Sequence, residues 1–206
     1  MVFSLTVSCT KETELFIQKQ HKWENLCRSY LVEARWFYSG YAPTLEEYLE
    51  NAWISMGGHA GIAHAYLLLE STMRKTCLDS FKINGSSPIY WSSLIAQLSD
   101  DLGTSKAEIM RGDLAKSIQY YMMEKGVTEE QAQDHIKGLI SFSWRKLNET
   151  IAKNSNPKSI ILTTLSLNMA RTAQCIYQHV DGVGKSTRVT RDHLMSLIAE
   201  PIAMFD

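Results

Sequence analysis

The sequence has no long apolar run, no excess of either charge and few cysteines. No stretch of its 206 residues is apolar over the roughly 20 positions that a membrane-spanning helix needs. The formal net charge is −1, and no basic patch carries interleaved aromatic residues. We therefore expect neither a membrane span nor a nucleic-acid partner. The N-terminus lacks a basic flank, so it does not have the pattern of a signal or transit peptide.

Cysteine pairs at metal or redox spacing are also missing. The four cysteines are widely scattered, and no two of them have the Cys-x-x-Cys spacing of a zinc site or a redox pair. We expect them to be reduced, mostly buried thiols in an intracellular protein. The sequence gives no indication of an oligomeric state.

Apolar residues, in contrast, are plentiful and recur at helical spacing. They make up 45% of the chain, which has the length of one domain or of a large piece of one. No stretch alternates convincingly as a β-strand, so we predict an all-α fold of seven or eight helices. The predicted helices cover residues 11–39, 45–54, 62–69, 88–98 leading into an acidic segment, 114–125, 128–147, 157–177 and 191–199.

Two capping patterns and one break divide this helical pattern. Thr44-x-x-Glu47 and Thr128-x-x-Gln131 each predict the start of a helix. The segment from Ser55 to Gly61 has three glycines in five residues, which should break or kink an apolar helix. Such a break exposes backbone carbonyls to any adjoining cavity. An ordinary loop between two helices fits this pattern equally well.

An acidic segment supplies the candidate metal ligands. Asp100, Thr104 and Glu108 stand four residues apart, so a helix would place all three oxygen-bearing side chains in one stripe. A carboxylate, a hydroxyl and a second carboxylate are ligands that a hard divalent cation such as Mg²⁺ prefers. Two alternatives remain open on spacing alone. Ser105-x-x-Glu108 also fits a helix capping box, and Asp100 and Asp101 could be solvated residues before a helix.

Several long stretches together carry a resemblance to a known family. They are S-G-Y-A-P-T-L-E-E-Y-L-E-N-A-W-I-S (Ser39 to Ser55), D-D-L-G-T-S-K-A-E (Asp100 to Glu108), R-G-D-L-A-K-S-I-Q-Y-Y-M (Arg111 to Met122), Y-Q-H-V-D-G (Tyr177 to Gly182) and S-L-I-A-E-P-I (Ser196 to Ile202). These stretches resemble plant class I terpene synthases of the monoterpene type. The similarity extends from about Trp23 to the end of the chain, whereas residues 1–20 match only weakly. The resemblance implies a class I terpenoid synthase helical bundle, truncated at its N-terminal side, with residues 1–206 as one partial catalytic domain.

The resemblance also implies a reaction and a set of site residues. In that family the acidic pattern binds one Mg²⁺ of a three-metal cluster, with Mn²⁺ as a substitute, and here it falls on Asp100, Thr104 and Glu108. The cluster grips a prenyl diphosphate, here expected to be geranyl diphosphate, and triggers loss of the diphosphate. Lys116 matches a diphosphate contact, and Tyr177 offers an aromatic face to the resulting cation.

Other parts of the implied cavity carry alternatives. The implied cavity wall at the helix break consists of Ser55, Met56, Gly57 and Gly58. Trp53 and Tyr66 are further candidates for aromatic faces, although plain core packing explains them equally well. Residues 179–187 match a lid. The family resides in plastids or in the cytoplasm, and the sequence indicates neither the terpene product nor the choice between a ten-carbon and a fifteen-carbon substrate.

The sequence departs from the family pattern in two ways. It contains no Asp-Asp-x-x-Asp, the motif that holds the other two metal ions, and Gln97 stands where the family has a diphosphate-binding arginine. One metal motif is a poor basis for ionising a substrate. We therefore predict a partial terpene synthase with little or no activity alone. The alternative is a catalytically silent helical remnant that only binds partners.

Overall fold

The computed structural model describes residues 2–71, 87–111, 116–153 and 160–177, together with residues 192, 195 and 196. Within these ranges all regular structure is helical and there is no strand, which confirms the all-α prediction. The helices are α1 (Val2–Ser39), α2 (Leu45–Ser55), α3 (Gly58–Ser71), α4 (Pro88–Arg111), α5 (Ser117–Lys125), α6 (Glu129–Lys153) and α7 (Ile160–Tyr177). The predicted lid and the predicted last helix lie almost entirely outside the described residues.

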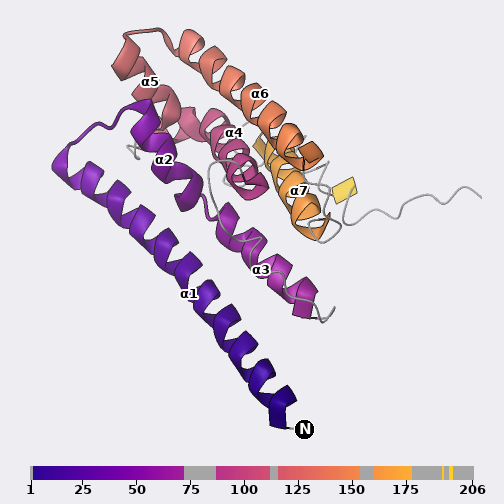
Figure 1. The fold of residues 1–206 in the computed structure, drawn as a ribbon. Coiled ribbons are helices and arrows are strands. Elements are labelled where there is room, and N and C mark those ends of the chain that lie inside the picture. The colour runs from indigo at the N-terminus through magenta and orange to yellow at the C-terminus, as the bar shows by residue number, and fades with distance from the viewer. Residues whose placement is uncertain are drawn as a thin grey trace, which may run out of the picture.

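Helix α4 is the centre of the bundle (Figure 1). It packs most extensively on α7 and α6 and also contacts α2, α3 and α5. Its side chains are buried on nearly all sides between Pro88 and Ser99, where three serines accompany Leu94, Ile95 and Leu98. Small residues let neighbouring helices approach closely. The second half of α4 carries the acidic segment, so the bundle's central helix also positions the candidate site.

The predicted capping patterns and two helix-ending glycines are confirmed by the structure. Thr44 caps α2 through a capping box with Glu47, and Thr128 exchanges the matching hydrogen bonds with Gln131 before α6. Gly40 and Gly126 end α1 and α5 with φ of 68° and 65°. This left-handed conformation is favourable for glycine and strained for other residues.

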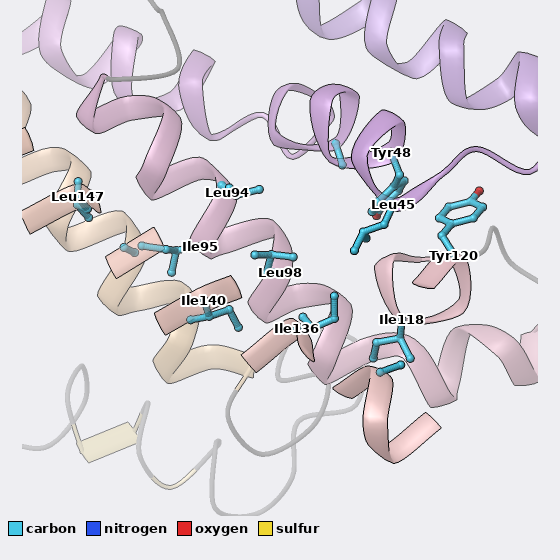
Figure 2. Close-up of a cluster of buried hydrophobic side chains, with 13 residues drawn as sticks. Leu45, Tyr48, Leu94, Ile95, Leu98, Ile118, Tyr120, Ile136, Ile140 and Leu147 are labelled. Carbon is cyan, nitrogen blue, oxygen red and sulfur yellow. The ribbon is translucent and has the colours of Figure 1, made fainter. Parts of the chain in front are cut away.

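The main hydrophobic core joins α2, α4, α5, α6 and one residue of α7 (Figure 2). Apolar side chains that recur every three or four residues on α4 and α6 face each other across it. Its buried members are Leu45, Tyr48, Ala52, Leu94, Ile95, Leu98, Ile118, Tyr120, Ala132, Ile136, Ile140, Leu147 and Ala170. A smaller cluster joins α3, the start of α4 and α7, and contains Tyr66.

Helix α1 lies at the edge of the bundle and exposes a row of large apolar side chains. It packs on α2 and α3 (Figure 1). Its exposed members are Trp23, Tyr30, Leu31, Phe37 and Tyr38. Contiguous exposed apolar surface is unusual on a monomeric soluble domain. These side chains give α1 an apolar face that the described helices leave uncovered.

A buried histidine in the first turn of α3 has no hydrogen-bond partner. His59 is 1% exposed, and neither of its ring nitrogens has a partner. Its ring meets Trp53 edge-on, with centroids 5.8 Å apart. Burial, and to a smaller extent the nearby Lys22 ammonium, lower the pKa of His59 to about 4. A weak contact with the main chain of Lys22 opposes these effects without cancelling them. His59 is therefore neutral in the folded chain.

Replacing His59 with leucine is expected to stabilise the chain, and more so in acid. At pH 7 the variant no longer buries unpaired ring nitrogens, a gain of about 1 kcal/mol. Between pH 6.5 and 4 the unfolded wild type binds a proton at residue 59 that the folded protein does not, so wild-type stability falls as the pH falls. We expect the gap between variant and wild type to widen by about 2 kcal/mol from pH 7 to pH 4.5.

Urea denaturation at both pH values measures this gap. Because Asp101 titrates alike in both proteins, its contribution cancels in the difference. His64→Leu is the matched control, since the His64 ring accepts a hydrogen bond from Trp23 Nε1 and makes another with the Ala60 carbonyl. That variant should lose stability at pH 7. A stability gap for His59→Leu that stays constant with pH would contradict the prediction.

Candidate active site

A cavity of about 370 Å³ opens between α1, α2, α4, α5 and the end of α7. Aromatic side chains form much of its wall, and three charged side chains face it. The lining residues are Tyr30, Glu33, Trp36, Tyr48, Ser55, Met56, Gln97, Asp100, Lys116, Tyr120 and Tyr177. Five of the residues expected from the sequence line this cavity together, namely Ser55, Met56, Asp100, Lys116 and Tyr177.

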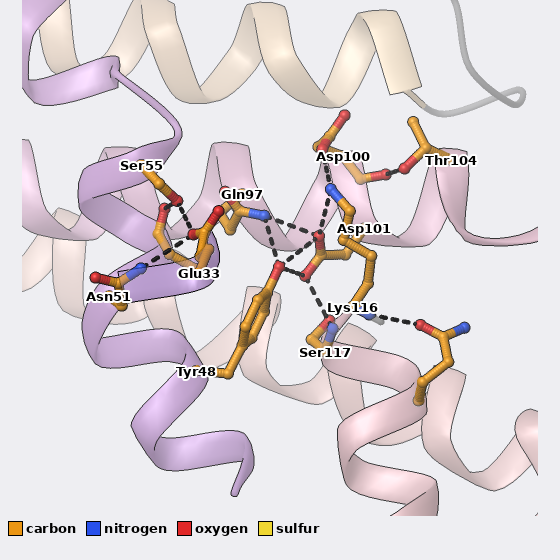
Figure 3. Close-up of polar contacts among 12 residues, drawn as sticks. Glu33, Tyr48, Asn51, Ser55, Gln97, Asp100, Asp101, Thr104, Lys116 and Ser117 are labelled. Carbon is orange, nitrogen blue, oxygen red and sulfur yellow. Dashed lines mark hydrogen bonds and ion pairs between the residues drawn. The ribbon is translucent and has the colours of Figure 1, made fainter. Parts of the chain in front are cut away.

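The acidic segment lies inside α4, as the metal hypothesis requires. Asp100 faces the cavity, and its side chain is 17% exposed. Thr104 lies one turn further along the helix, and its Oγ1 donates a hydrogen bond to the Asp100 carbonyl at 2.9 Å (Figure 3). A hydroxyl that donates its proton keeps lone pairs that can face a cation. Glu108 follows on the same helix, but its side chain lies outside the described residues.

Both alternatives for this segment are wrong. Helix α4 runs without interruption from Pro88 to Arg111, so Ser105 and Glu108 cannot cap its N-terminus. Asp101 is not solvated, because it is completely buried. Among the described residues, no three His, Cys, Asp or Glu side chains lie close enough to hold a metal ion by themselves. A bound ion would therefore depend on Glu108, water or a ligand for the rest of its coordination shell.

Lys116 brings a positive charge to the same end of the cavity. Its Nζ lies 3.5 Å from Asp100 Oδ2 and 3.8 Å from Asp101 Oδ1. Lys116 stands just before α5, and its own backbone is extended. An ammonium beside a carboxylate gives this end of the cavity one group that attracts anions and one that attracts cations.

A buried network behind Asp100 was not anticipated from the sequence. The Asp101 carboxylate accepts hydrogen bonds from Tyr48 Oη at 3.1 Å, from Gln97 Nε2 at 2.8 Å and from the Ser117 amide at 3.3 Å. Gln97 also donates to Tyr48 Oη at 3.1 Å. Burial raises the pKa of Asp101 to about 6, against the lowering effect of the Lys116 charge. The network ties α2, α4 and the start of α5 together immediately behind the cavity wall.

The spacing within α4 contained a signal for part of this network. Consecutive residues on a helix point about 100° apart, so Asp100 and Asp101 cannot face the same way. Asp101 and Gln97 are four residues apart and share a face. The partners Tyr48 and Ser117 come from other helices, and only the tertiary fold brings them together.

The break between α2 and α3 forms another part of the wall. The Met56 amide still bonds to the Ala52 carbonyl at 2.9 Å, and Gly57 then takes a φ of 76° that ends the helical path. Ser55 and Met56 line the cavity, whereas Gly57 and Gly58 are not among its described lining residues. Gly58 instead permits close packing, since a Cβ there would lie 2.8 Å from Met169 Sδ.

Tyr177 reaches the cavity from the end of α7. Its backbone lies directly against α4, because a Cβ on Gly103 would come within 3.0 Å of the Tyr177 carbonyl oxygen. Trp53 and Tyr66 are not among the described cavity-lining residues, and both pack in hydrophobic clusters. The core-packing interpretation therefore fits these two aromatic residues.

One expectation about the cysteines is wrong in the described residues. Cys27 and Cys175 are free but exposed, because each lies on the outward face of its helix rather than in the core.

None of the helices among the described residues has the length and apolarity needed to cross a bilayer.

Comparison with known proteins identifies what this arrangement is similar to. Residues 2–146 match the family described as "Terpene synthase family, metal binding domain". The chain is 57% identical over 181 residues to probable terpene synthase 9 of Ricinus communis, covering 88% of this chain and 30% of that protein. It is 46% identical over 205 residues to a chloroplastic myrcene synthase of Quercus ilex, covering 98% of this chain and 34% of that protein. The chain thus spans about a third of the length of these curated relatives.

Solved structures give the same picture. A limonene synthase bound to 2-fluorolinalyl diphosphate is 31% identical, with a TM-score of 0.77, over 90% of this chain and 34% of that chain. An isoprene synthase from grey poplar leaves, in complex with three Mg²⁺ ions and dimethylallyl-S-thiolodiphosphate, is 29% identical, with a TM-score of 0.73, over 90% of this chain and 35% of that chain.

Proposed function

This chain belongs to the terpene synthase family, and we propose that it is the metal-binding part of a monoterpene synthase that ionises geranyl diphosphate with the help of Mg²⁺. One observation carries the proposal. Asp100 of α4, Lys116 just before α5 and Tyr177 at the end of α7 meet on one cavity with the aromatic side chains of α1 and α2. The curated relatives, among them a trans-ocimene synthase and a myrcene synthase, support a ten-carbon substrate.

The donor set fits a hard divalent cation. Asp100 faces the cavity with a carboxylate, Thr104 adds a hydroxyl oxygen one turn away, and Glu108 follows on the same helix. These three residues would hold Mg²⁺, or Mn²⁺ in its place. When bound, the ion supplies positive charge that stabilises a departing diphosphate.

The remaining side chains suit the two products of ionisation. Lys116 would bind diphosphate oxygens at the end of the cavity where Asp100 lies, because its ammonium already faces that carboxylate at 3.5 Å. Tyr177, Trp36 and Tyr30 would cover the allylic cation and keep water from it. In this assignment Ser55 and Met56 shape the wall beside the cation.

Two features support the proposal that the chain has little activity of its own. The second candidate function is that of a catalytically silent helical remnant. The sequence lacks Asp-Asp-x-x-Asp, and Gln97 is occupied by a buried hydrogen-bond network. A neutral amide in that position cannot replace an arginine as a diphosphate ligand.

Several relatives are named chloroplastic. We therefore propose plastid residence rather than residence in the cytoplasm.

A chimera separates these two candidates. The matching third of the Quercus ilex myrcene synthase is replaced by this chain, and the purified chimera, the chain alone and the parent enzyme are incubated with Mg²⁺ and geranyl diphosphate. We expect monoterpenes from the chimera and the parent, and none from the chain alone. A folded chimera without product, beside an active parent, would favour the silent remnant. Vigorous turnover by the chain alone would refute its dependence on the missing motif.

A further inference from the structure

Glu33 places a second carboxylate on the cavity, away from the candidate metal ligands. It projects from the C-terminal part of α1 and lines the cavity beside the break between α2 and α3. Its Oε1 accepts a hydrogen bond from Asn51 Nδ2 at 3.0 Å and a short one from Ser55 Oγ. Figure 3 shows Glu33, Asn51 and Ser55 on one side of Gln97, and Asp100 and Lys116 on the other.

The Glu33 carboxylate has no cationic partner among the described residues. Both of its hydrogen-bond partners are neutral, and no described cationic side chain forms an ion pair with it. The Lys116 ammonium, which also lines the cavity, lies beside Asp100 and Asp101 instead. Among the described lining residues, two carboxylates and one ammonium thus face the cavity, which leaves an excess of negative charge on the Glu33 side.

The effect of this charge reaches the aromatic wall. Burial raises the pKa of Tyr120, and the negative charge of Glu33 is the next largest cause. Glu33 acts in the same direction on Tyr48, where burial and Asp101 have larger effects. Both phenols therefore remain neutral and present aromatic faces close to an anionic group. Aromatic faces combined with a carboxylate are the usual recognition elements for organic cations.

The hydrogen bonds alone do not explain an acidic residue at this position. Asn51 and Ser55 need only an acceptor oxygen, which a neutral amide provides as well. Asn51 also donates to the Ser29 carbonyl at 3.1 Å, so it is partly held without Glu33. Keeping an unpaired carboxylate on a partly buried cavity costs desolvation free energy. A bound cation would offset that cost.

We propose that Glu33 is the counter-charge for an organic cation held in this cavity, and that in the proposed reaction it stabilises the allylic cation after diphosphate has left. This inference rests on the proposed function for the identity of the natural cation. The binding property itself belongs to the described residues of this chain and needs neither a metal ion nor turnover.

The test measures binding of two matched probes to the full 206-residue chain by calorimetry, without Mg²⁺ or diphosphate. Geranyltrimethylammonium carries a fixed positive charge, and its isostere with carbon in place of nitrogen is neutral. We expect the wild type to bind the cation about tenfold tighter than the isostere. Glu33→Gln keeps an acceptor for Asn51 and Ser55 but removes the charge, so the preference should fall to about twofold or less.

Two controls separate charge from structure. Glu24→Gln, on the same helix but exposed and paired with Arg28, should leave the preference unchanged. Asn51→Ala removes one hydrogen bond to Glu33 outside the cavity lining and keeps the carboxylate, so it should also retain the preference. Circular dichroism checks that each variant is folded, and if Glu33→Gln does not fold, the wild-type comparison of the two probes still decides.

Three results would overturn the proposal: equal affinity of the wild type for both probes, binding of neither probe, or a preference that survives in Glu33→Gln. Failure of the proposed function gives a different pattern. There the chimera forms no terpene although the cation preference is present, whereas a productive chimera without the preference rejects the role of Glu33 alone.

Discussion

Replacing Asp101 with alanine is expected to lower the free energy of unfolding by about 3 kcal/mol. The carboxylate is fully buried and accepts hydrogen bonds from Tyr48, Gln97 and the Ser117 amide. Alanine leaves the Tyr48 hydroxyl and the Ser117 amide without their acceptor, whereas Gln97 keeps its hydrogen bond to Tyr48 Oη. The Ser117 amide is the most costly of them, because it is fixed at the start of α5 and cannot turn toward water. Urea denaturation at pH 7 measures the loss.

Two further variants show whether the network causes the loss. Asp101→Asn keeps an acceptor oxygen and the size of the side chain, so we expect a smaller decrease of about 1 kcal/mol. Asp134→Ala removes an exposed aspartate that pairs with Lys137, and its effect should stay within about 0.5 kcal/mol. If Asp101→Ala is no more destabilising than Asp134→Ala, the network contributes nothing to the fold.

The pH dependence gives an independent check on Asp101. Its pKa is about 6 in the folded chain and close to 4 in an unfolded one, so the folded state binds a proton more readily. This group therefore makes the chain more stable as the pH falls from about 6 toward 4, the opposite of His59. Asp101→Asn removes the effect, whereas His59→Leu keeps it.

Local patterns in the sequence predicted the fold well, because helix starts and stops are decided by neighbouring residues. The Thr44–Glu47 capping box and the break near Gly57 are examples, each set by the chemistry of a few adjacent positions. The predicted family is confirmed by the matching family, and the class I bundle by its solved neighbours. The first helix begins earlier than its apolar stripe indicated, at Val2.

The site was predictable only where one helix holds it. Asp100 and Thr104 lie on one face of α4 because their spacing follows the helical repeat. Glu33 is a different case, since its contacts with Asn51 and Ser55 join residues 18 and 22 positions apart on separate helices. No local pattern records which face of α1 meets α2. The hydrogen bonds that Gln97 donates to Asp101 and Tyr48 likewise depend on packing between helices.

Removing the Asp100 carboxylate is expected to reduce terpene formation by the chimera at least ~100-fold. Asp100 is the one predicted metal ligand whose described side chain lines the cavity, and it faces the Lys116 ammonium. Asp100→Ala removes a ligand oxygen and allows Lys116 to turn toward Asp101, which is already 3.8 Å away. Both changes weaken the grip on a metal-bound diphosphate at the moment its charge develops.

Steady-state rates at increasing Mg²⁺ distinguish a metal ligand from a residue that merely supports the fold. For Asp100→Ala we expect both a lower kcat and a higher Mg²⁺ concentration at half-maximal rate, with little change in thermal unfolding. Asp101→Ala should lower the temperature of thermal unfolding and leave the Mg²⁺ concentration at half-maximal rate unchanged, since it acts on the buried network and destabilises the bundle. The two aspartates are adjacent in sequence but point to different faces of α4. If Asp100→Ala changed only stability, or left the Mg²⁺ dependence as in the wild type, Asp100 would not be a metal ligand.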